Sequence, residues 1–270
     1  MILGFYPYVH SFIIKSALFY FIKMRYFLEL AYRGTNYQGW QKQPGDRPTV
    51  QDTIELSLST LLNTPTAVIG CGRTDTGVHA KQFFLHFDLD KELPKNFLYR
   101  LNKHLPKDIS IFKIIPVEPE HHARFGASHR AYEYRIITRK DPFEIDTAHY
   151  YPFSKLTDQD KMQEAAKLLL DYKEFFPFCK SNNDANTMRC EIYHAAWTFD
   201  EHQWVFNIAA NRFLRGMIRL IVGMCLNVGQ DKISLQEVKQ ALEKQSLLKK
   251  SLSVDASGLY LKDIRYPFIR

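Results

Sequence analysis

One carboxylate stands inside a glycine-rich stretch of the chain, "GCGRTDTGVHA" at residues 70–80. Asp75 follows Arg73 by two positions, and the three glycines around them permit positive φ and close approach of another backbone. The stretch could be an ordinary turn in which Asp75 bonds to its own backbone. A solvated turn has no need for an arginine and an aspartate together, whereas such a pair suits a cleft that handles phosphates. Asp75 is therefore the first candidate for a reacting group.

A second stretch, "HHARFGASHRAYEYRI" at residues 121–136, combines basic residues with tyrosines. Alternation along a strand would put Tyr132 and Tyr134 on one face of a sheet. Two tyrosines on one face are commonly part of a core. The histidines and arginines before them favour base stacking or phosphate contact.

A third stretch, "NRFLRGMIRLIVG" at residues 211–223, has the apolar spacing of a helix. Arg212, Arg215 and Arg219 would form one stripe on that helix, and a solvated basic face is the simplest interpretation. Arginines at the start of a helix oppose its dipole unless an anion lies nearby. The pattern therefore points to Asp75 or to a phosphate as their partner.

The overall composition is compatible with a nucleic-acid partner but does not require one. The 270 residues carry a formal net charge of +7 together with 20 Phe and 15 Tyr, which suits phosphates and stacked bases. Many basic enzymes nevertheless bind no nucleic acid. The four cysteines form no C-x-x-C pair, so buried thiols in a reducing cytosol are expected rather than a zinc site.

The first residues of the chain are apolar enough to suggest a leader or an anchor. Lys15 divides this run into segments shorter than the roughly 20 residues that span a membrane. No small-residue cleavage site follows, and the sequence runs directly into a strand pattern after Met24. We therefore expect residues 1–23 to be a non-native or dispensable extension, and we expect no membrane association.

The remaining pattern predicts the elements that would position these residues. Residues 24–116 read as β-α-β-β-α-β, the ferredoxin-like or RRM-like order, and residues 117–270 repeat that order as topology. Thr49 is expected to cap a helix, and a further short helix is expected over 234–244. The sequence thus predicts an α+β protein with two such halves, whose antiparallel sheets join side by side. An active-site cleft would lie between the N-terminal domain, which carries the Asp75 loop, and the C-terminal domain.

Taken together, the motifs resemble those of the tRNA pseudouridine synthase A (TruA) family. The motifs occur in the family's order between Arg25 and about Pro267: "YRGTNYQGWQKQ", "GRTDTGVHA", "HARF", "RAYEYRI", "NRFLRGMIRLIVG" and "GLYL". The resemblance implies a tRNA pseudouridine synthase, an isomerase that converts uridine to pseudouridine at positions 38, 39 and 40 of the anticodon stem-loop. It also implies a cytoplasmic homodimer that holds tRNA across both subunits and needs no metal or organic cofactor.

The resemblance also assigns roles to individual residues. Asp75 is implied to be the catalytic residue, and Arg219 its partner. Tyr132 is implied to lie against the target uracil, Arg73 to hold the flipped-out nucleotide, and Leu259 of the terminal motif to bind substrate. The carboxylate would act either as a nucleophile or as a base at C2′, and the sequence does not choose between these mechanisms.

Two departures from the family pattern and two alternative functions stay open. Thr76 stands where alanine is usual, and the stretch 176–192 differs from the family's Ser/Arg-rich version. The main alternative is a non-catalytic RNA-binding protein on paired RRM-like sheets, although the R/K-G-F/Y-G/A-F run is missing from the sequence. A hydrolase is a weaker alternative, because the sequence contains neither G-x-S-x-G nor H-E-x-x-H.

Overall fold

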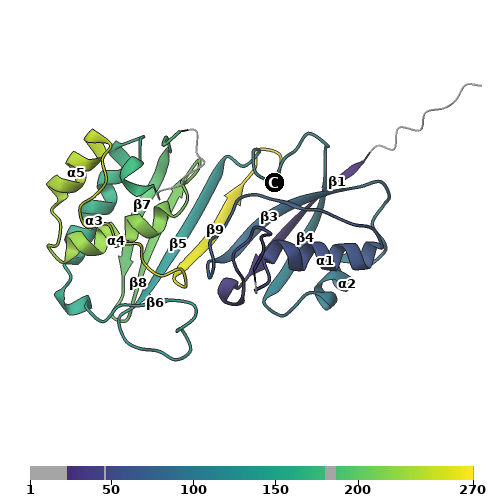
Figure 1. The fold of residues 1–270 in the computed structure, drawn as a ribbon, viewed down its shortest axis with the longest axis horizontal. Helices are drawn as coiled ribbons and strands as arrows, with labels where there is room; N and C mark the ends of the chain where they lie inside the picture. The colour runs from purple at the N-terminus through teal and green to yellow at the C-terminus, as the bar shows by residue number, and fades with distance from the viewer. Residues whose placement is uncertain (1–22, 46, 180–186, 270) are drawn as a thin grey trace, which may run out of the picture.

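The chain forms an α+β structure built on one large, mostly antiparallel sheet (Figure 1). The computed structural model describes residues 23–45, 47–179 and 187–269. The predicted N-terminal extension, apart from Lys23, therefore lies outside the described residues. The main path of the sheet runs, in spatial order, through β4 (Ile109–Val117), β1 (Met24–Tyr32), β3 (His79–Leu89), β9 (Leu259–Arg265), β5 (His129–Ile137), β8 (Gln203–Ala210) and β7 (Ile192–Phe199).

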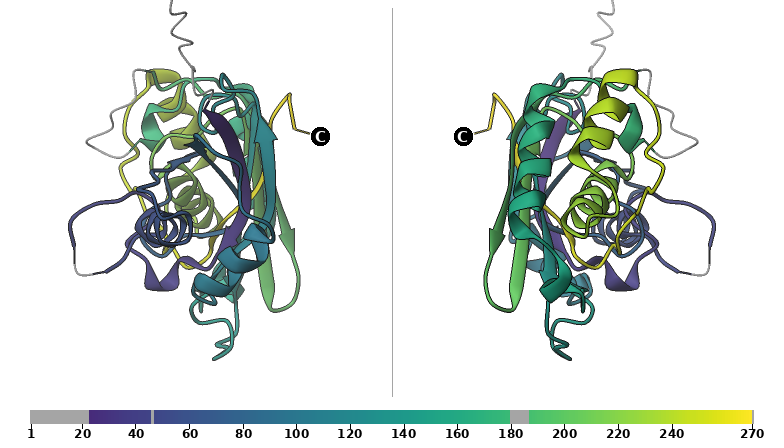
Figure 2. Two further views of the ribbon diagram at one scale, coloured as in Figure 1. Left: turned by 90° about the vertical axis from the view of Figure 1, so that its right-hand side faces the viewer. Right: turned by 90° about the vertical axis from the view of Figure 1, so that its left-hand side faces the viewer.

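Two short strands and the helices complete the fold of the described residues. The strand β2 (Ile69–Gly70) pairs with β3, and β6 (His149–Tyr150) pairs with β5. The helices gather on one side of the sheet (Figure 2). These helices are α1 (Val50–Leu62), α2 (Phe97–His104), α3 (Gln159–Leu168), α4 (Met217–Gly229) and α5 (Leu235–Lys244).

Two predicted helices begin at a side-chain cap, and Thr49 was the cap that the sequence predicted. Thr49 is the N-cap of α1, and its hydroxyl accepts a hydrogen bond from the backbone N–H of Asp52 at 3.1 Å. Ser234 and Glu237 form a reciprocal capping box at the start of α5. Each cap satisfies backbone donors that the first turn leaves unpaired, which fixes where the helix begins.

The start of α4 differs from the prediction. The sequence predicted a helix from residue 211, whereas α4 begins at Met217 after Gly216, which has φ +72°. A residue in the left-handed region cannot continue a right-handed helix, so the preceding segment is an irregular lead-in. Arg212 and Arg215 therefore lie outside the helix, and only Arg219 belongs to its first turn. The predicted stripe of three arginines on one helix face is wrong.

The two parts of the sheet meet where β3 and β9 run parallel for two residue pairs, His79 with Tyr260 and Ala80 with Leu261. The same β9 pairs antiparallel with β5, so the sheet is continuous rather than two sheets in contact. Two cores lie on either side of this junction. Leu259 packs in the core of the later part of the chain, while Leu261 packs in the core of the earlier part. The last strand therefore contributes to both cores, and the predicted division at residues 116 and 117 stays a prediction.

Candidate active site

The loop that carries Asp75 connects β2 to β3 and is anchored by its own backbone. The backbone N–H of Cys71 donates to the carbonyl of Phe84 at 2.8 Å, and the carbonyl of Thr74 accepts from Trp40 at 3.1 Å. The Thr74 hydroxyl lies 2.9 Å from the phenol oxygen of Tyr32. Of the glycines predicted to allow positive φ, only Gly77 has it. The loop is thus fixed on the buried side, while the Asp75 side chain keeps 27% of its surface exposed.

Two arginines flank the Asp75 carboxylate. Nε of Arg215 lies 3.7 Å from one carboxylate oxygen, and Nη1 of Arg219 lies 3.7 Å from the other. The Arg219 side chain is 17% exposed and the Arg215 side chain 69% exposed. Nε of Arg219 also donates to the carbonyl of Val254 at 2.6 Å. Arg219 is therefore a fixed partner of the carboxylate, whereas Arg215 reaches it from solvent.

Tyr132 lies beside this pair on β5. Its ring packs edge-on against Phe213, with 5.3 Å between the ring centroids, and contacts both cores. Burial raises the pKa of the Tyr132 phenol; the positive charge of Arg130 opposes that shift, and the negative charge of Asp75 adds to it. The phenol is therefore protonated at neutral pH and lies within electrostatic range of the carboxylate.

The other predicted site residues lie at different depths. Arg73 and Thr76 are exposed on the same loop, and neither side chain has a hydrogen bond or ion pair within the described parts of the chain. Leu259 is 7% exposed and pairs with Tyr134 across the sheet, so it is a core residue beneath the site. The structure thus brings Asp75, Tyr132 and Arg219 together, but it shows no contact from Arg73 to them.

Arg130 belongs to the basic stretch that favoured phosphate contact, and it has a structural role instead. Its guanidinium donates to the backbone carbonyls of Ala127, Asn211, Cys71 and Arg124 at 2.7 to 3.3 Å. Because these bonds occupy the guanidinium, Arg130 ties the Asp75 loop to the segment that leads into α4. It has little capacity left for a ligand.

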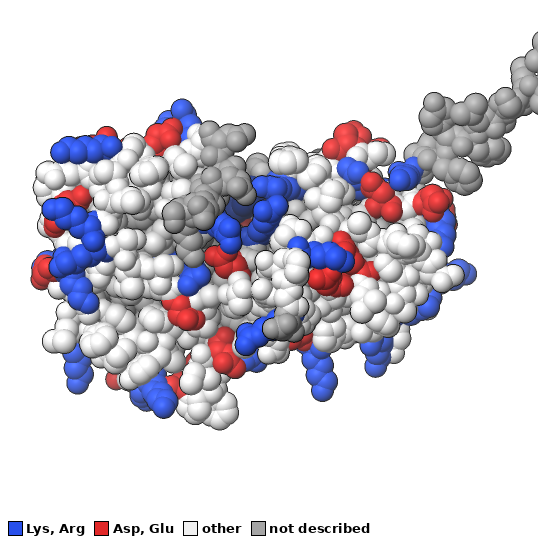
Figure 3. All heavy atoms as spheres, viewed as in Figure 1, with Lys and Arg blue, Asp and Glu red and all other residues white. Residues whose placement is uncertain are grey.

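A small basic cavity lies along the same lead-in segment. Its volume is about 250 Å³, and its lining residues are Lys173, Thr187, Arg189, Glu191, Asn211 and Arg212. Arg212 stands three residues before Arg215, so the cavity is connected to the Asp75 site by a short run of backbone. On the face that carries the helices, Lys and Arg side chains gather where the two parts of the sheet meet (Figure 3). Residues 180–186 of the divergent stretch 176–192 lie outside the described residues.

Two residues that hold the site were missed by the sequence analysis. Val254 acts through its backbone carbonyl, so its side-chain type carries no signal. His79 is the third residue of the "GVHA" part of the opening motif and is 1% exposed. A histidine four residues after Asp75 was the one sequence signal for it.

Two further features of the described residues are the state of two buried cysteines and the grouping of possible metal ligands. Burial raises the pKa of Cys71 and of Cys225 to about 12 in each case, so both thiols are protonated at neutral pH. Within residues 23–45, 47–179 and 187–269, no three His, Cys, Asp or Glu side chains are grouped as metal ligands. No helix in those ranges has the length and apolar character needed to cross a membrane.

A family model and the most similar relatives by sequence agree with each other. A family model described as tRNA pseudouridine synthase matches residues 30–126 and 165–267. Proteins named tRNA pseudouridine synthase A from Parabacteroides distasonis and Porphyromonas gingivalis are 43% and 42% identical to this chain over 90% of its length, covering 96% and 97% of theirs. The protein of that name from Clostridium acetobutylicum is 35% identical over 88% of this chain and 98% of its own length. The matched ranges include the Asp75 loop, the Arg219 helix and β9.

Proposed function

The chain belongs to the tRNA pseudouridine synthase family, and on that premise we propose that it isomerises uridine to pseudouridine at positions 38, 39 and 40 of the anticodon stem-loop. The observation that best supports this proposal is the Asp75 carboxylate, which is partly exposed and lies 3.7 Å from each of two arginines. The reaction breaks the glycosidic C–N bond, turns the uracil and joins its C5 to the sugar. It involves no redox change, so side chains alone can supply the chemistry.

Asp75 is the reacting group in this proposal. Its carboxylate either attacks the sugar as a nucleophile or removes a proton at C2′, and both routes need the ionised form. Arg219 holds the carboxylate from the buried side. Because Arg219 is itself fixed by the carbonyl of Val254, the carboxylate meets the substrate in one orientation.

Extrusion of the target base is assigned to the exposed part of the loop and to Tyr132. Flipping a nucleotide costs a few kcal/mol of stacking and pairing, which an aromatic ring and a guanidinium can partly offset. The Tyr132 ring supports the uracil, and the exposed Arg73 holds the flipped-out nucleotide or its phosphate. Leu259 lies in the core, so it contributes only by shaping the floor of the site.

The fold supports two βαββαβ halves with the site between them. The strand orders β4-β1-β3 and β9-β5-β8-β7 are similar around their first strands, β1 and β5, and a separate core lies on each side of the junction, with β9 contributing to both. The N-terminal domain of residues 24–116 supplies Asp75, and the C-terminal domain of residues 117–270 supplies Tyr132 and Arg219. The basic cavity beside Arg212 suits phosphates of the RNA backbone. We assign the protein to the cytoplasm and expect it to act as a homodimer.

The experiment is the substitution Asp75→Asn. The amide keeps the shape of the side chain and removes the charge, so we expect tRNA to bind with nearly unchanged affinity and pseudouridine formation to stop. Asp88→Asn is the matched control, because Asp88 pairs with Arg25 at 2.7 Å and belongs to the same strand system but not to the loop. Normal turnover of Asp75→Asn would favour the alternative of an RNA-binding protein whose carboxylate does no chemistry.

A further inference from the structure

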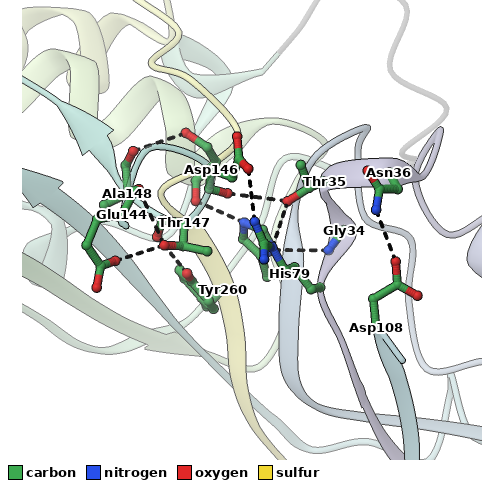
Figure 4. A network of polar contacts seen from close by, with 12 residues as sticks. Gly34, Thr35, Asn36, His79, Asp108, Glu144, Asp146, Thr147, Ala148 and Tyr260 are labelled. Carbon is green, nitrogen blue, oxygen red and sulfur yellow. Dashed lines mark hydrogen bonds and ion pairs between the residues drawn. The ribbon is translucent and has the colours of Figure 1, made fainter. Parts of the chain in front are cut away.

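His79 lies at the junction of the two parts of the sheet and makes a hydrogen bond with each ring nitrogen (Figure 4). The backbone N–H of Gly34 donates to Nδ1 at 3.0 Å, and Nε2 lies 3.0 Å from the carbonyl oxygen of Ser257. A carbonyl only accepts, so the proton is on Nε2 and the imidazole is neutral. The ring stacks on Tyr260 with 4.6 Å between centroids. Both partners and the ring position are thus determined by backbone atoms.

The approach of Gly34 shows how closely the backbone is packed here. A Cβ atom on Gly34 would lie 1.9 Å from the carbonyl oxygen of Val78, so only glycine fits. Val78 comes from the earlier part of the chain but packs in the core of the later part. Arg33 adds an ion pair to Asp146 at 3.0 Å across the same junction. The region around His79 is therefore where the two parts are fastened together.

The segment that His79 contacts is the one that holds Arg219. Arg219 donates from Nε to the carbonyl of Val254 at 2.6 Å, and the N–H of Val254 donates to the carbonyl of Arg219 at 3.3 Å. Within this segment the N–H of Ser257 donates to the Asp255 carboxylate at 2.8 Å, which stiffens the turn. His79 therefore reaches, through Ser257, the short turn on which Arg219 rests.

His79 is also close to Asp75, because it stands only four residues later in the chain. The N–H of Val78, its neighbour, donates to the carbonyl of Asp75 at 3.2 Å and closes the tight end of the loop. The contacts form a ring that passes from Asp75 through His79, Ser257 and Val254 to Arg219 and returns to the Asp75 carboxylate. The pairing of His79 with Tyr260 keeps β3 and β9 together, so loss of the Ser257 bond would shift the turn that carries Val254 rather than separate the strands.

We propose that His79 is a positioning residue whose Nε2–H···O bond to Ser257 sets the separation between Asp75 and Arg219. The inference rests on the proposed function, in which Asp75 is the reacting group. His79 does not touch the substrate. A displacement of about 1 Å in a reacting group can cost on the order of a hundredfold in rate, so the bond acts on kcat.

Two substitutions separate the two ring nitrogens. In His79→Gln the amide N–H₂ takes the place of Nε2–H and can still reach Ser257. In His79→Asn the amide oxygen takes the place of Nδ1, so the bond to Gly34 can be kept while Ser257 loses its donor. We expect His79→Gln to keep kcat within about threefold, and His79→Asn to lose on the order of a hundredfold in kcat at unchanged KM for tRNA.

The measurements are single-turnover pseudouridine formation, tRNA affinity and thermal unfolding for both variants. A folded His79→Asn with wild-type kcat overturns the inference, and so does a hundredfold loss in a folded His79→Gln. The second outcome decides the matter even where His79→Asn does not fold. Asp75→Asn is assayed in parallel: if it stays active, the proposed function has failed, whereas an inactive Asp75→Asn beside a fully active His79→Asn rejects the positioning role alone.

Discussion

The two arginines beside Asp75 should differ in importance. Arg219 is 17% exposed and fixed by Val254, whereas Arg215 is 69% exposed and free to move in solvent. A preorganised charge in a partly dry site is worth more than a solvated one, so we expect Arg219→Ala to lower kcat on the order of a hundredfold and Arg215→Ala less than about tenfold. Single-turnover rates with saturating enzyme measure this. The reverse ranking would identify Arg215 as the functional partner.

Tyr132 should act through its ring. The ring packs edge-on against Phe213 and is placed to support an extruded uracil, while its hydroxyl has no hydrogen-bond partner within the described residues. We expect Tyr132→Phe to keep most of the activity and Tyr132→Ala to lose more than about tenfold, the scale of one base-stacking contact. Steady-state kinetics on tRNA distinguish the two. A phenylalanine variant as inactive as the alanine variant would assign the role to the hydroxyl.

Sequence motifs indicated which residues lie close together better than how each of them is held. Asp75 and Arg219 come from distant motifs, and the structure brings them together as the resemblance implied. Arg73 has no protein partner among the described residues, and no pattern in the sequence could reveal that. Leu259 also belongs to a matching motif, yet it is buried in the core, and the motif alone does not distinguish a packing residue from a substrate-binding one.

The glycine before α4 should be required at the level of the element. Gly216 has φ +72°, a conformation that costs an L-residue roughly 1 to 2 kcal/mol. Alanine there would lower the melting temperature and, by extending the helix backwards, would turn Arg215 away from Asp75. We therefore expect Gly216→Ala to lose both stability and kcat.

Gly72→Ala is the matched control for that change. Gly72 lies in the Asp75 loop, has no positive φ, and has no atom within 4 Å of the position where a Cβ would stand. Its melting temperature should stay near that of the wild type. Calorimetry on both variants measures the two melting temperatures. Equal melting temperatures would show that the positive φ of Gly216 does not make alanine costly at that position.

Local signals decided which elements could be predicted. The capping residues Thr49 and Ser234 stand directly before their helices, so the starts of α1 and α5 were readable from type and spacing. The start of α4 was not, because an apolar helical pattern continues through residues 211–216 while the backbone does not. The periodicity there reflects burial of Leu214, which packs in the core from outside the helix.

At the scale of the whole molecule, the sequence did not predict how the two parts of the sheet are joined. The βαββαβ order was visible twice, but the continuous sheet depends on two residue pairs between β3 and β9, strands that are separated by most of the chain. Such a contact leaves no periodic trace. It is nevertheless the contact that brings Asp75 from one part toward Arg219 from the other, so the site exists only when both parts are folded together.

The pH dependence of folding should involve both parts of the molecule, because histidines with a lowered pKa occur in each. Burial is the first cause of a lowered pKa at five histidines: His79, His86, His122, His129 and His149. Unfolding returns each to its ordinary value of about 6.5, so the unfolded chain takes up more protons below that pH. The stability that neutral histidines contribute is therefore complete above pH 6.5 and is lost as the pH falls toward their native values.

His86 should account for a large part of that loss. Burial, reinforced by the positive charges of Arg25 and His122, lowers the pKa of His86 to about 4, and its Nδ1 accepts a hydrogen bond from the N–H of Ala123 at 3.1 Å. Carboxylates such as Asp88, whose pKa is lowered by its hydrogen bond with Arg25, lose their contribution mainly below their ordinary values of about 4. The histidines with a lowered pKa therefore dominate the loss of stability between pH 6.5 and about 5. His86→Asn keeps an acceptor for Ala123 but does not titrate, so its melting temperature should fall less steeply across that window than that of the wild type. A slope equally steep in His86→Asn and in the wild type would show that another group drives the acid instability.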